Sequence, residues 1–294
     1  MRLFLELTKS KIIVFVLLTG TAGYALGLPI IVEWDWAIYL LTLFSLYFFS
    51  AGSFALNQAQ EVSVDQKMPR TLGRPIPSGK ISRAQAYFLG FSFVALGIFV
   101  SSFVNQTVLI TGLATVFLYN VLYTLYWKKK WAFGAVPGAV PGAMPFVIGY
   151  AGHAQTIFTP TCVYGFMIMF LWQMPHFWAL AIKYKDDYVL GGIPVLPARI
   201  GTNATLYHIG LYTFCYVGLA LASPWFTRPG IAYLVFVIPT AFKVLYEFLK
   251  YYRSEGRERW LGFFLWVNFS MLIFLAAPVL DRLIDFYRVG GDGQ

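Results

Sequence analysis

The sequence predicts an all-α membrane protein, a single domain over residues 1–294 that forms a bundle of about nine transmembrane helices. Hydrophobic residues make up 59% of the chain and charged residues only 12%, which leaves too little polar surface to cover a soluble domain of 294 residues. A bilayer core about 30 Å thick requires roughly 20 mostly apolar residues per helix. Such stretches cover about residues 12–31, 37–57, 84–104, 107–127, 132–151, 161–182, 206–226, 230–249 and 260–280. They lack the alternation of apolar and polar residues expected of membrane strands.

The basic residues predict how the bundle is oriented. Lysine and arginine gather in the cytoplasmic loops of membrane proteins. Of the 22 lysines and arginines, 18 lie before the first span or in the loops after the second, fourth, sixth and eighth spans. Arg228, Arg282 and Arg288 lie on the opposite side, and Lys243 lies within the eighth span. We therefore expect a cytoplasmic N-terminus and an external C-terminus, and the net charge of +9 needs no nucleic acid to explain it.

The cysteines and the N-terminal residues place the chain in its compartment. Cys162 and Cys215 fall inside apolar spans at no metal-ligand spacing, so we expect both to be small core residues. The chain enters its first span without a cleavage site or an Arg-rich leader. We expect a multi-pass protein of a bacterial or archaeal cell membrane rather than a mitochondrial one.

The loop after the second span opens with a polar stripe. Asn57, Glu61 and Asp65 are spaced four residues apart, which places them on one face of a helix that continues through them. Such oxygen ligands suit Mg²⁺, which takes one or two carboxylates together with phosphate oxygens and water. Arg70 and Arg74 follow closely and are suited to bidentate contacts with a phosphate. The alternative is a solvated helix end whose carboxylates pair with nearby lysines and arginines.

The loop after the sixth span carries a second polar group. Asp186 and Asp187 lie close to Lys183 and lead into a Gly/Pro-rich turn at residues 191–197. About one turn inside the membrane, His176 has tryptophan neighbours that favour a planar aromatic substrate. A hydrogen-bonded core histidine beside interfacial anchor residues fits the same pattern.

The end of the fourth span carries a third, weaker element. Tyr123 and Thr124 offer hydroxyl groups to a phosphate, and Lys128 offers a positive charge. All three elements fall at the predicted cytoplasmic ends of their spans. A transporter would instead place polar groups near the bilayer midplane, in helices related by an internal repeat.

Together these motifs resemble the UbiA superfamily of intramembrane prenyltransferases, and specifically its protoheme IX farnesyltransferase (heme O synthase) branch. The resemblance covers essentially the whole chain, through Leu7–Lys9, Asn57–Pro75, Tyr123–Lys128, Pro175–Phe177 and Asp186–Pro197. The last two segments distinguish the heme branch from relatives that prenylate hydroxybenzoate or naphthoate. Other branches carry a second Asp-x-x-x-Asp motif, and this chain has Lys183 in place of its first aspartate. The resemblance therefore leaves open whether Asp186 or Asp187 completes the metal site.

The resemblance implies transfer of the farnesyl group of farnesyl diphosphate to a vinyl group of heme b, which gives heme o. It implies catalytic, Mg²⁺-holding residues, namely Asn57, Glu61 and Asp65 with Asp186 or Asp187, and a diphosphate-binding set of Arg70, Arg74, Tyr123, Lys128 and Lys183. It assigns His176 to the heme. The expected partners are the lipid bilayer and a downstream heme A synthase or oxidase-assembly protein. A UbiA-type enzyme for a phenolic or quinone-precursor acceptor and a polytopic transporter are the alternatives.

Overall fold

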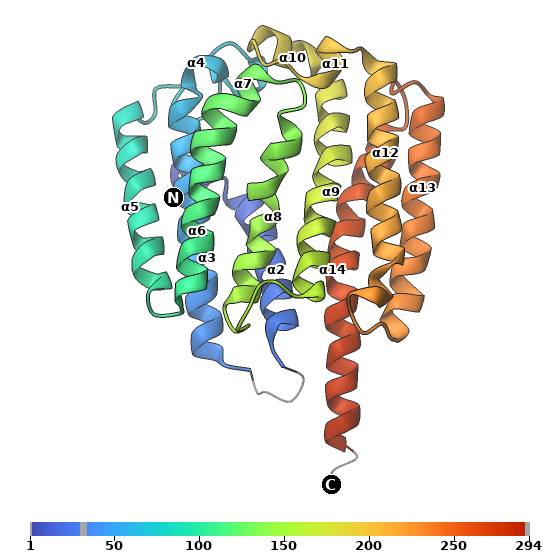
Figure 1. Ribbon diagram of the computed structural model, residues 1–294. Coiled ribbons are helices and arrows are strands. Elements are labelled where there is room, and N and C mark those ends of the chain that lie inside the picture. Colours follow the sequence, from blue (N-terminus) through green and yellow to red (C-terminus); the bar gives the residue numbers. More distant parts are fainter. Residues whose placement is uncertain (1, 30–33, 292–294) are drawn as a thin grey trace.

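The chain folds into a bundle of long helices that lie side by side (Figure 1). The computed structural model describes residues 2–29 and 34–291, and every regular element in those ranges is a helix. The long helices are α2 (Ser10–Gly27), α3 (Trp36–Gln60), α5 (Arg83–Ser101), α6 (Gln106–Phe117), α8 (Ala135–Ala151), α9 (Pro160–Lys183), α12 (Thr202–Leu221), α13 (Ile238–Arg253) and α14 (Trp260–Gly291). The predicted all-α class is confirmed.

The predicted spans correspond to these helices. In the described ranges seven helical stretches are long and apolar enough to cross a membrane, formed by α2, α3, α5, α6 with its continuation to Lys130, α9, α12 and α14. The other two predicted spans, 132–151 and 230–249, are also helical. The first is the 17-residue helix α8, and the second runs from η4 (Tyr233–Val237) through α13. The predicted end of the first span, residues 30–31, lies outside the described residues.

Small residues allow the backbones of α2 and α8 to approach closely. A methyl group added to Gly149 would collide with the carbonyl of Gly20, and one added to Gly23 would collide with the carbonyl of Phe146. Close approach of this kind is how helices associate in a membrane, where lipid tails are as apolar as the side chains. The helices α2 and α8 therefore pack with their backbones in direct contact.

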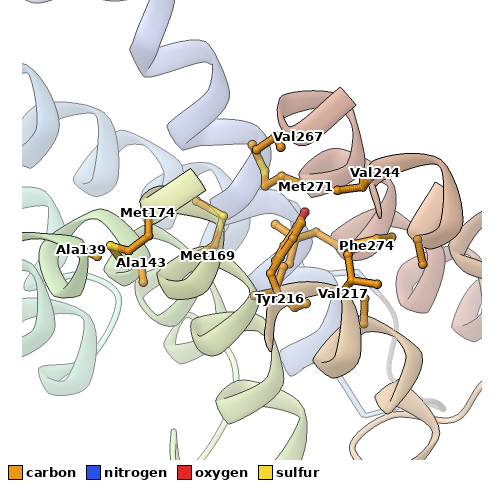
Figure 2. Packing of buried hydrophobic residues seen from close by; sticks show 14 of the residues in the cluster. Ala139, Ala143, Met169, Met174, Tyr216, Val217, Val244, Val267, Met271 and Phe274 are labelled. Carbon is orange, nitrogen blue, oxygen red and sulfur yellow. The ribbon is translucent and has the colours of Figure 1, made fainter. Parts of the chain in front are cut away.

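A second region of tight packing joins α8, α9, α12, α13 and α14. Figure 2 shows Tyr216 and Val217 of α12 with Met271 and Phe274 of α14 in this cluster. Cys162 is buried in it, as predicted. The prediction that Cys215 is a core residue is wrong, because its side chain is exposed on the outside of α12. The outer surface of a membrane protein is itself apolar, so an apolar span does not separate core from lipid-facing positions.

One end of the bundle carries most of the short elements. Figure 1 shows α4 (Val62–Asp65), α7 (Lys128–Lys130), α10 (Lys185–Leu190) and α11 (Leu196–Arg199) together at that end. The short helices α1 (Arg2–Leu7) and η1 (Pro69–Thr71) complete the set of connecting elements near the polar motifs. The motifs found in the sequence therefore meet at a common end of the bundle.

Candidate active site

The polar stripe lies where α3 gives way to α4. Helix α3 ends at Gln60, and Glu61 has non-helical angles (φ −101°, ψ 8°), so the expectation of one uninterrupted helix is wrong at this residue. The spacing survives the break, because the N–H of Glu61 donates to the carbonyl of Asn57 at 3.0 Å and that of Asp65 to the carbonyl of Glu61 at 2.9 Å. All three side chains are buried, with exposed fractions of 2%, 3% and 1% for Asn57, Glu61 and Asp65.

Both carboxylates of the stripe are paired with basic residues. The Nζ of Lys128 lies 2.6 and 2.8 Å from the two oxygens of Glu61. One terminal nitrogen of Arg74 contacts both oxygens of Asp65, at 2.6 and 2.8 Å. Burial alone would raise the pKa of Glu61, but the charge and hydrogen bond of Lys128, together with the charges of Lys9 and Arg74, hold that pKa below its ordinary value. The carboxylates of the free protein are thus paired with basic residues, as in the alternative of a solvated helix end. They are, however, buried and not solvated.

A lysine that the sequence analysis did not assign to the site completes the network. The Nζ of Lys9 donates to Oδ1 of Asn57 at 3.0 Å, and Nδ2 of Asn57 donates to Thr124 at 3.1 Å. Gln58 donates to the carbonyls of Glu6 and Leu7 and so holds the residues that precede Lys9. Lys9 itself has a left-handed backbone (φ 51°) directly before the first residue of α2.

The environment of Lys9 is rich in positive charge. Burial lowers the pKa of Lys9 to about 7, and the charges of Arg74 and Lys128 act in the same direction, while Glu61 and Asp65 oppose them. Several cations held close together in a buried place favour the arrival of an anion. In the sequence Lys9 stood only in the short Leu7–Lys9 segment of the family resemblance and directly before an apolar span, a position equally typical of a lysine at the membrane surface.

The fourth span reaches the site through an unusual helix. Residues Leu118–Trp127 form the π-helix η2, and the hydroxyl of Thr124 donates to the carbonyl of Tyr119, five residues earlier, at 2.8 Å. The rings of Tyr119 and Tyr123 stack with centroids 5.8 Å apart. π-helical turns are rare and frequently occur at functional sites. Here the turn ends at Lys128, whose side chain extends to Glu61.

The second polar group meets the first through Arg70. The Nε of Arg70 lies 3.8 Å from Oδ2 of Asp187, and its guanidinium lies over the rings of Tyr184 and Tyr188, at 4.9 and 5.4 Å from the centroids. Met68 packs in one apolar cluster with Tyr188 and other residues of this loop. The two loops, more than 100 residues apart in sequence, are therefore joined at the same end of the bundle.

Two predicted site residues lie further from this network. Asp186 is exposed, and its carboxylate has no ion pair within the described part of the chain. The Nζ of Lys183 lies 3.7 Å from the centre of the Trp260 ring, so this lysine is directed toward α14. Of the acidic residues in the second loop, Asp187 is thus the better placed to act with Asp65 and Glu61.

The oxygen ligands fit Mg²⁺ in their chemistry. Across residues 2–29 and 34–291 no three His, Cys, Asp or Glu side chains are close enough together to hold one ion. A cage of that kind is not what Mg²⁺ needs, because it is usually held by one or two carboxylates plus substrate phosphates and several waters. Glu61 and Asp65, with the amide oxygen of Asn57, supply carboxylate and amide oxygens at a place surrounded by cations suited to phosphate.

An apolar cavity of about 320 Å³ lies beneath the polar network. Its wall includes Tyr119 and Tyr123 of η2, Phe49 of α3 and His176 of α9. His176 packs between Trp172 and Phe264, with ring centroids 4.7 and 5.0 Å away, and its Nδ1 is buried without a hydrogen-bond partner among the described residues. The volume is within the range of ligand pockets, roughly 300–1,000 Å³. The arrangement accepts a molecule with an anionic head and a hydrocarbon tail.

Comparison with known proteins agrees with this geometry. Residues 16–268 match the model of the UbiA prenyltransferase family. The chain belongs to the UbiA family. Among its relatives are protoheme IX farnesyltransferases of Bdellovibrio bacteriovorus, 52% identical over 96% of this chain and 97% of the relative, and of Leptospira biflexa, 34% identical over 96% and 99%. The resemblance seen in the motifs is confirmed.

Solved structures show the same UbiA fold. A structure of digeranylgeranylglyceryl phosphate synthase is similar with a TM-score of 0.77 and 22% identity, over 96% of this chain and 98% of that chain. A UbiA homolog from Archaeoglobus fulgidus bound to DMAPP and Mg²⁺ is similar with a TM-score of 0.69 and 18% identity, over 93% and 98%. At these identities the likeness establishes the fold of the bundle.

Proposed function

We propose that this chain transfers the farnesyl group of farnesyl diphosphate to a vinyl group of heme b, producing heme o and diphosphate. The observation that carries the proposal is the 52% identity to a protoheme IX farnesyltransferase over 96% of the chain. The buried cations above an apolar cavity supply the matching geometry, because the substrate has a diphosphate head and a hydrocarbon tail.

The polar network holds the diphosphate. Lys9, Arg74 and Lys128 surround Asn57, Glu61 and Asp65 at hydrogen-bonding distance. Arg70 adds a guanidinium beside Asp187, and Tyr123 lies at the boundary between the network and the cavity. Lys183 lies over Trp260 in the free protein, and we propose that it turns from this ring to bind outer oxygens of the same group. Catalysis of this reaction is electrostatic, because breaking the allylic C–O bond leaves negative charge on the departing diphosphate.

The proposed cofactor is Mg²⁺, held by Asn57, Glu61, Asp65 and Asp187, with Asp186 as the outer alternative to Asp187. The ion supplies further neutralisation of the leaving group and fixes its orientation. The chain's own part is to place the carboxylates at the cytoplasmic end of α3 and α10 and to surround them with lysine and arginine.

The cavity protects the reactive intermediate. The farnesyl cation is quenched by water. The apolar wall of the cavity, which includes Phe49 and Met169, therefore keeps water from the reacting carbon until the heme vinyl group attacks. Water then adds to the resulting cation and releases a proton, which gives the hydroxyethylfarnesyl group. We propose that His176, with Trp172 and Phe264 on its two sides, contacts the porphyrin.

The charge distribution supports the orientation, and the bacterial relatives support a bacterial membrane. We propose that the chain is a single domain of a bacterial cell membrane, with the N-terminus and the diphosphate site at the cytoplasmic side and the C-terminus outside. Heme o would then pass within the membrane to a heme A synthase or an oxidase-assembly protein.

The test is a reaction with purified protein in detergent. Protein, heme b, farnesyl diphosphate and Mg²⁺ are incubated, and the porphyrin is analysed by mass spectrometry. We expect the mass of heme o to appear, and to disappear when farnesyl diphosphate or Mg²⁺ is left out. A parallel reaction offers 4-hydroxybenzoate as acceptor. Unchanged heme together with prenylated hydroxybenzoate would reject the heme assignment in favour of a phenolic acceptor.

A further inference from the structure

A second cavity lies at the end of the bundle opposite the polar network. It has a volume of about 470 Å³ and is bounded by the last residues of α2, the loop after α8, the start of α9, the segment before η4 and the lower part of α14. In Figure 1 these helix ends lie on the side away from α4, α7, α10 and α11. Nothing in the proposed transferase reaction uses this cavity.

Two arginines line the cavity without a counter-ion. Arg228 and Arg282 both border it, and in the described ranges neither has a carboxylate within 4.0 Å. A terminal nitrogen of Arg282 donates to the carbonyl of Leu26 at 2.6 Å, which leaves its other N–H groups for a ligand. Arg228 is exposed and makes no hydrogen bond among the described residues. Because Arg228 and Arg282 line the same cavity, two cations share one site.

A buried carboxylate fixes the positions of the two arginines. Asp281 accepts hydrogen bonds from the backbone N–H groups of Gly230, Ala232 and Tyr233, at 2.8, 2.7 and 3.1 Å. These bonds attach the segment that follows Arg228 to α14, one residue before Arg282. The backbone that follows Arg228 is therefore held against the turn of α14 that carries Arg282, and both side chains extend from this contact to the same cavity.

The rim of the cavity has the character of a membrane interface. Phe158 and Trp225, in the loops that contribute Thr159 and Thr227 to the cavity wall, are 87% and 85% exposed, the highest values among the large apolar side chains described. Aromatic residues exposed at helix ends are typical of the level of lipid head groups. The opening of the cavity is thus expected at the level of the lipid head groups, which carry the phosphates.

The charge of the cavity matches a phosphodiester. Asp285 also lines it, so two guanidinium groups and one carboxylate leave one net positive charge when His153 is neutral. A phosphodiester carries one negative charge, whereas a free phosphate carries more. We propose that this cavity binds the phosphate group of a phospholipid in the leaflet opposite the transferase site. The lipid tails would lie along the apolar surface beside Trp225.

The test measures lipid binding directly. Binding of dioctanoyl phosphatidylglycerol to the purified full chain in detergent is quantified by native mass spectrometry. Arg228→Gln and the double variant with Arg282→Gln are compared with the wild type. Arg257→Gln is the matched control, since Arg257 is exposed in the loop before α14 and its guanidinium group lies 3.5 Å from Glu255, away from the cavity.

We expect Arg228→Gln to bind the lipid about tenfold more weakly, as for loss of one charge-assisted contact, and the double variant to bind more weakly still. The control should bind like the wild type. Dioctanoylglycerol, which has the same tails and no phosphate, should bind weakly to all variants. Wild-type binding by Arg228→Gln would overturn the proposal, and that variant decides the matter even if Arg282→Gln fails to fold. Equal affinity for glycerol 3-phosphate and the lipid would also overturn it, in favour of a soluble phosphate.

Discussion

Glu61 is buried in a position where its charge is needed both with and without substrate. Its two oxygens contact Lys128 in the free protein, and we propose that they hold Mg²⁺ in the reacting complex. Glu61→Gln keeps the shape of the side chain and removes its charge. We expect heme o formation to fall about 100-fold or more, the scale seen when one electrostatic group is removed from an active site.

The control for this variant is another buried glutamate that pairs with a lysine. Glu247 of α13 contacts Lys243 at 2.7 Å, outside the polar network. Glu247→Gln loses a comparable pair, so its rate of heme o formation should stay close to that of the wild type. Full activity in Glu61→Gln, or equal loss in both variants, would contradict the metal-holding role.

Lys9 gives a second prediction at this scale. Its Nζ binds Asn57 and adds a positive charge to the diphosphate site. Lys9→Met should raise the KM for farnesyl diphosphate about tenfold, because a charge-assisted contact with the anion is lost. Steady-state kinetics at varied farnesyl diphosphate would show this. Lys11→Met, an exposed lysine two residues on, should leave KM unchanged, and an unchanged KM in Lys9→Met would remove Lys9 from the site.

The sequence predicted some of these residues and missed others for a physical reason. Asn57, Glu61 and Asp65 stood out because their spacing reports a local helical geometry. Lys9 did not, because its contact with Asn57 joins positions 48 residues apart and depends on the packing of α1 and α2 against α3. The pairing of Glu61 with Lys128 is non-local in the same way, across 67 residues.

Among the elements, the irregular ones were the hardest to predict. Apolar composition predicts a helix over 107–127 but does not distinguish α6 from the π-helix η2, because the same side chains suit either hydrogen-bond pattern. The contact that accompanies η2 is tertiary, since Thr124 in this helix also accepts a hydrogen bond from Asn57 of α3. The break at Glu61 likewise has no glycine or proline to signal it in the sequence, and it occurs at a residue that pairs with the distant Lys128.

The close pair of helices α2 and α8 gives a prediction about stability. Gly149→Ala places a methyl group against the carbonyl of Gly20, so the two helices must separate. We expect a loss of about 1–3 kcal/mol in the free energy of unfolding, the usual cost of overpacking. The measurement is the midpoint of thermal unfolding in detergent.

Gly218→Ala in α12 is the control for this variant, since no atom lies within 4 Å of the added methyl group. Alanine also favours a helix over glycine, so this midpoint should stay the same or rise slightly. If Gly149→Ala were as stable as Gly218→Ala, the close approach of α2 and α8 would not be needed for the fold.

At the scale of the whole molecule, the orientation in the membrane is open to a direct test. Single cysteines replace Gln155, in the loop after α8, or Glu258, in the loop before α14, after Cys162 and Cys215 are changed to serine. Both introduced positions are exposed. We expect a membrane-impermeant maleimide to label Gln155→Cys in intact cells and Glu258→Cys only after permeabilisation, as measured by a gel shift. The reverse pattern would place the N-terminus outside.

Hydropathy predicted the course of the chain through the bundle better than it predicted the ends of the helices. The last span was expected to end near residue 280, where Asp281 and Arg282 follow, yet α14 continues to Gly291. Both charged residues form hydrogen bonds with backbone groups. Asp281 accepts from three N–H groups, and Arg282 donates to the carbonyl of Leu26. From sequence alone, such charged residues are expected to contact water. The backbone groups that bind them instead belong to segments far away in the sequence.

The ion pairs of the polar network have a consequence for how substrate enters. Glu61, Asp65 and Asp187 already face Lys128, Arg74 and Arg70, so each acid has a basic partner in the empty protein, and Lys9 is the fourth base of the network. When a diphosphate arrives with its metal ion, the ion pairs exchange partners. The basic residues then contact the diphosphate, and the carboxylates contact the metal ion. Entry together with the metal ion thus brings less unbalanced charge into the low-dielectric interior than entry of the bare diphosphate, which would leave the acids facing a like charge.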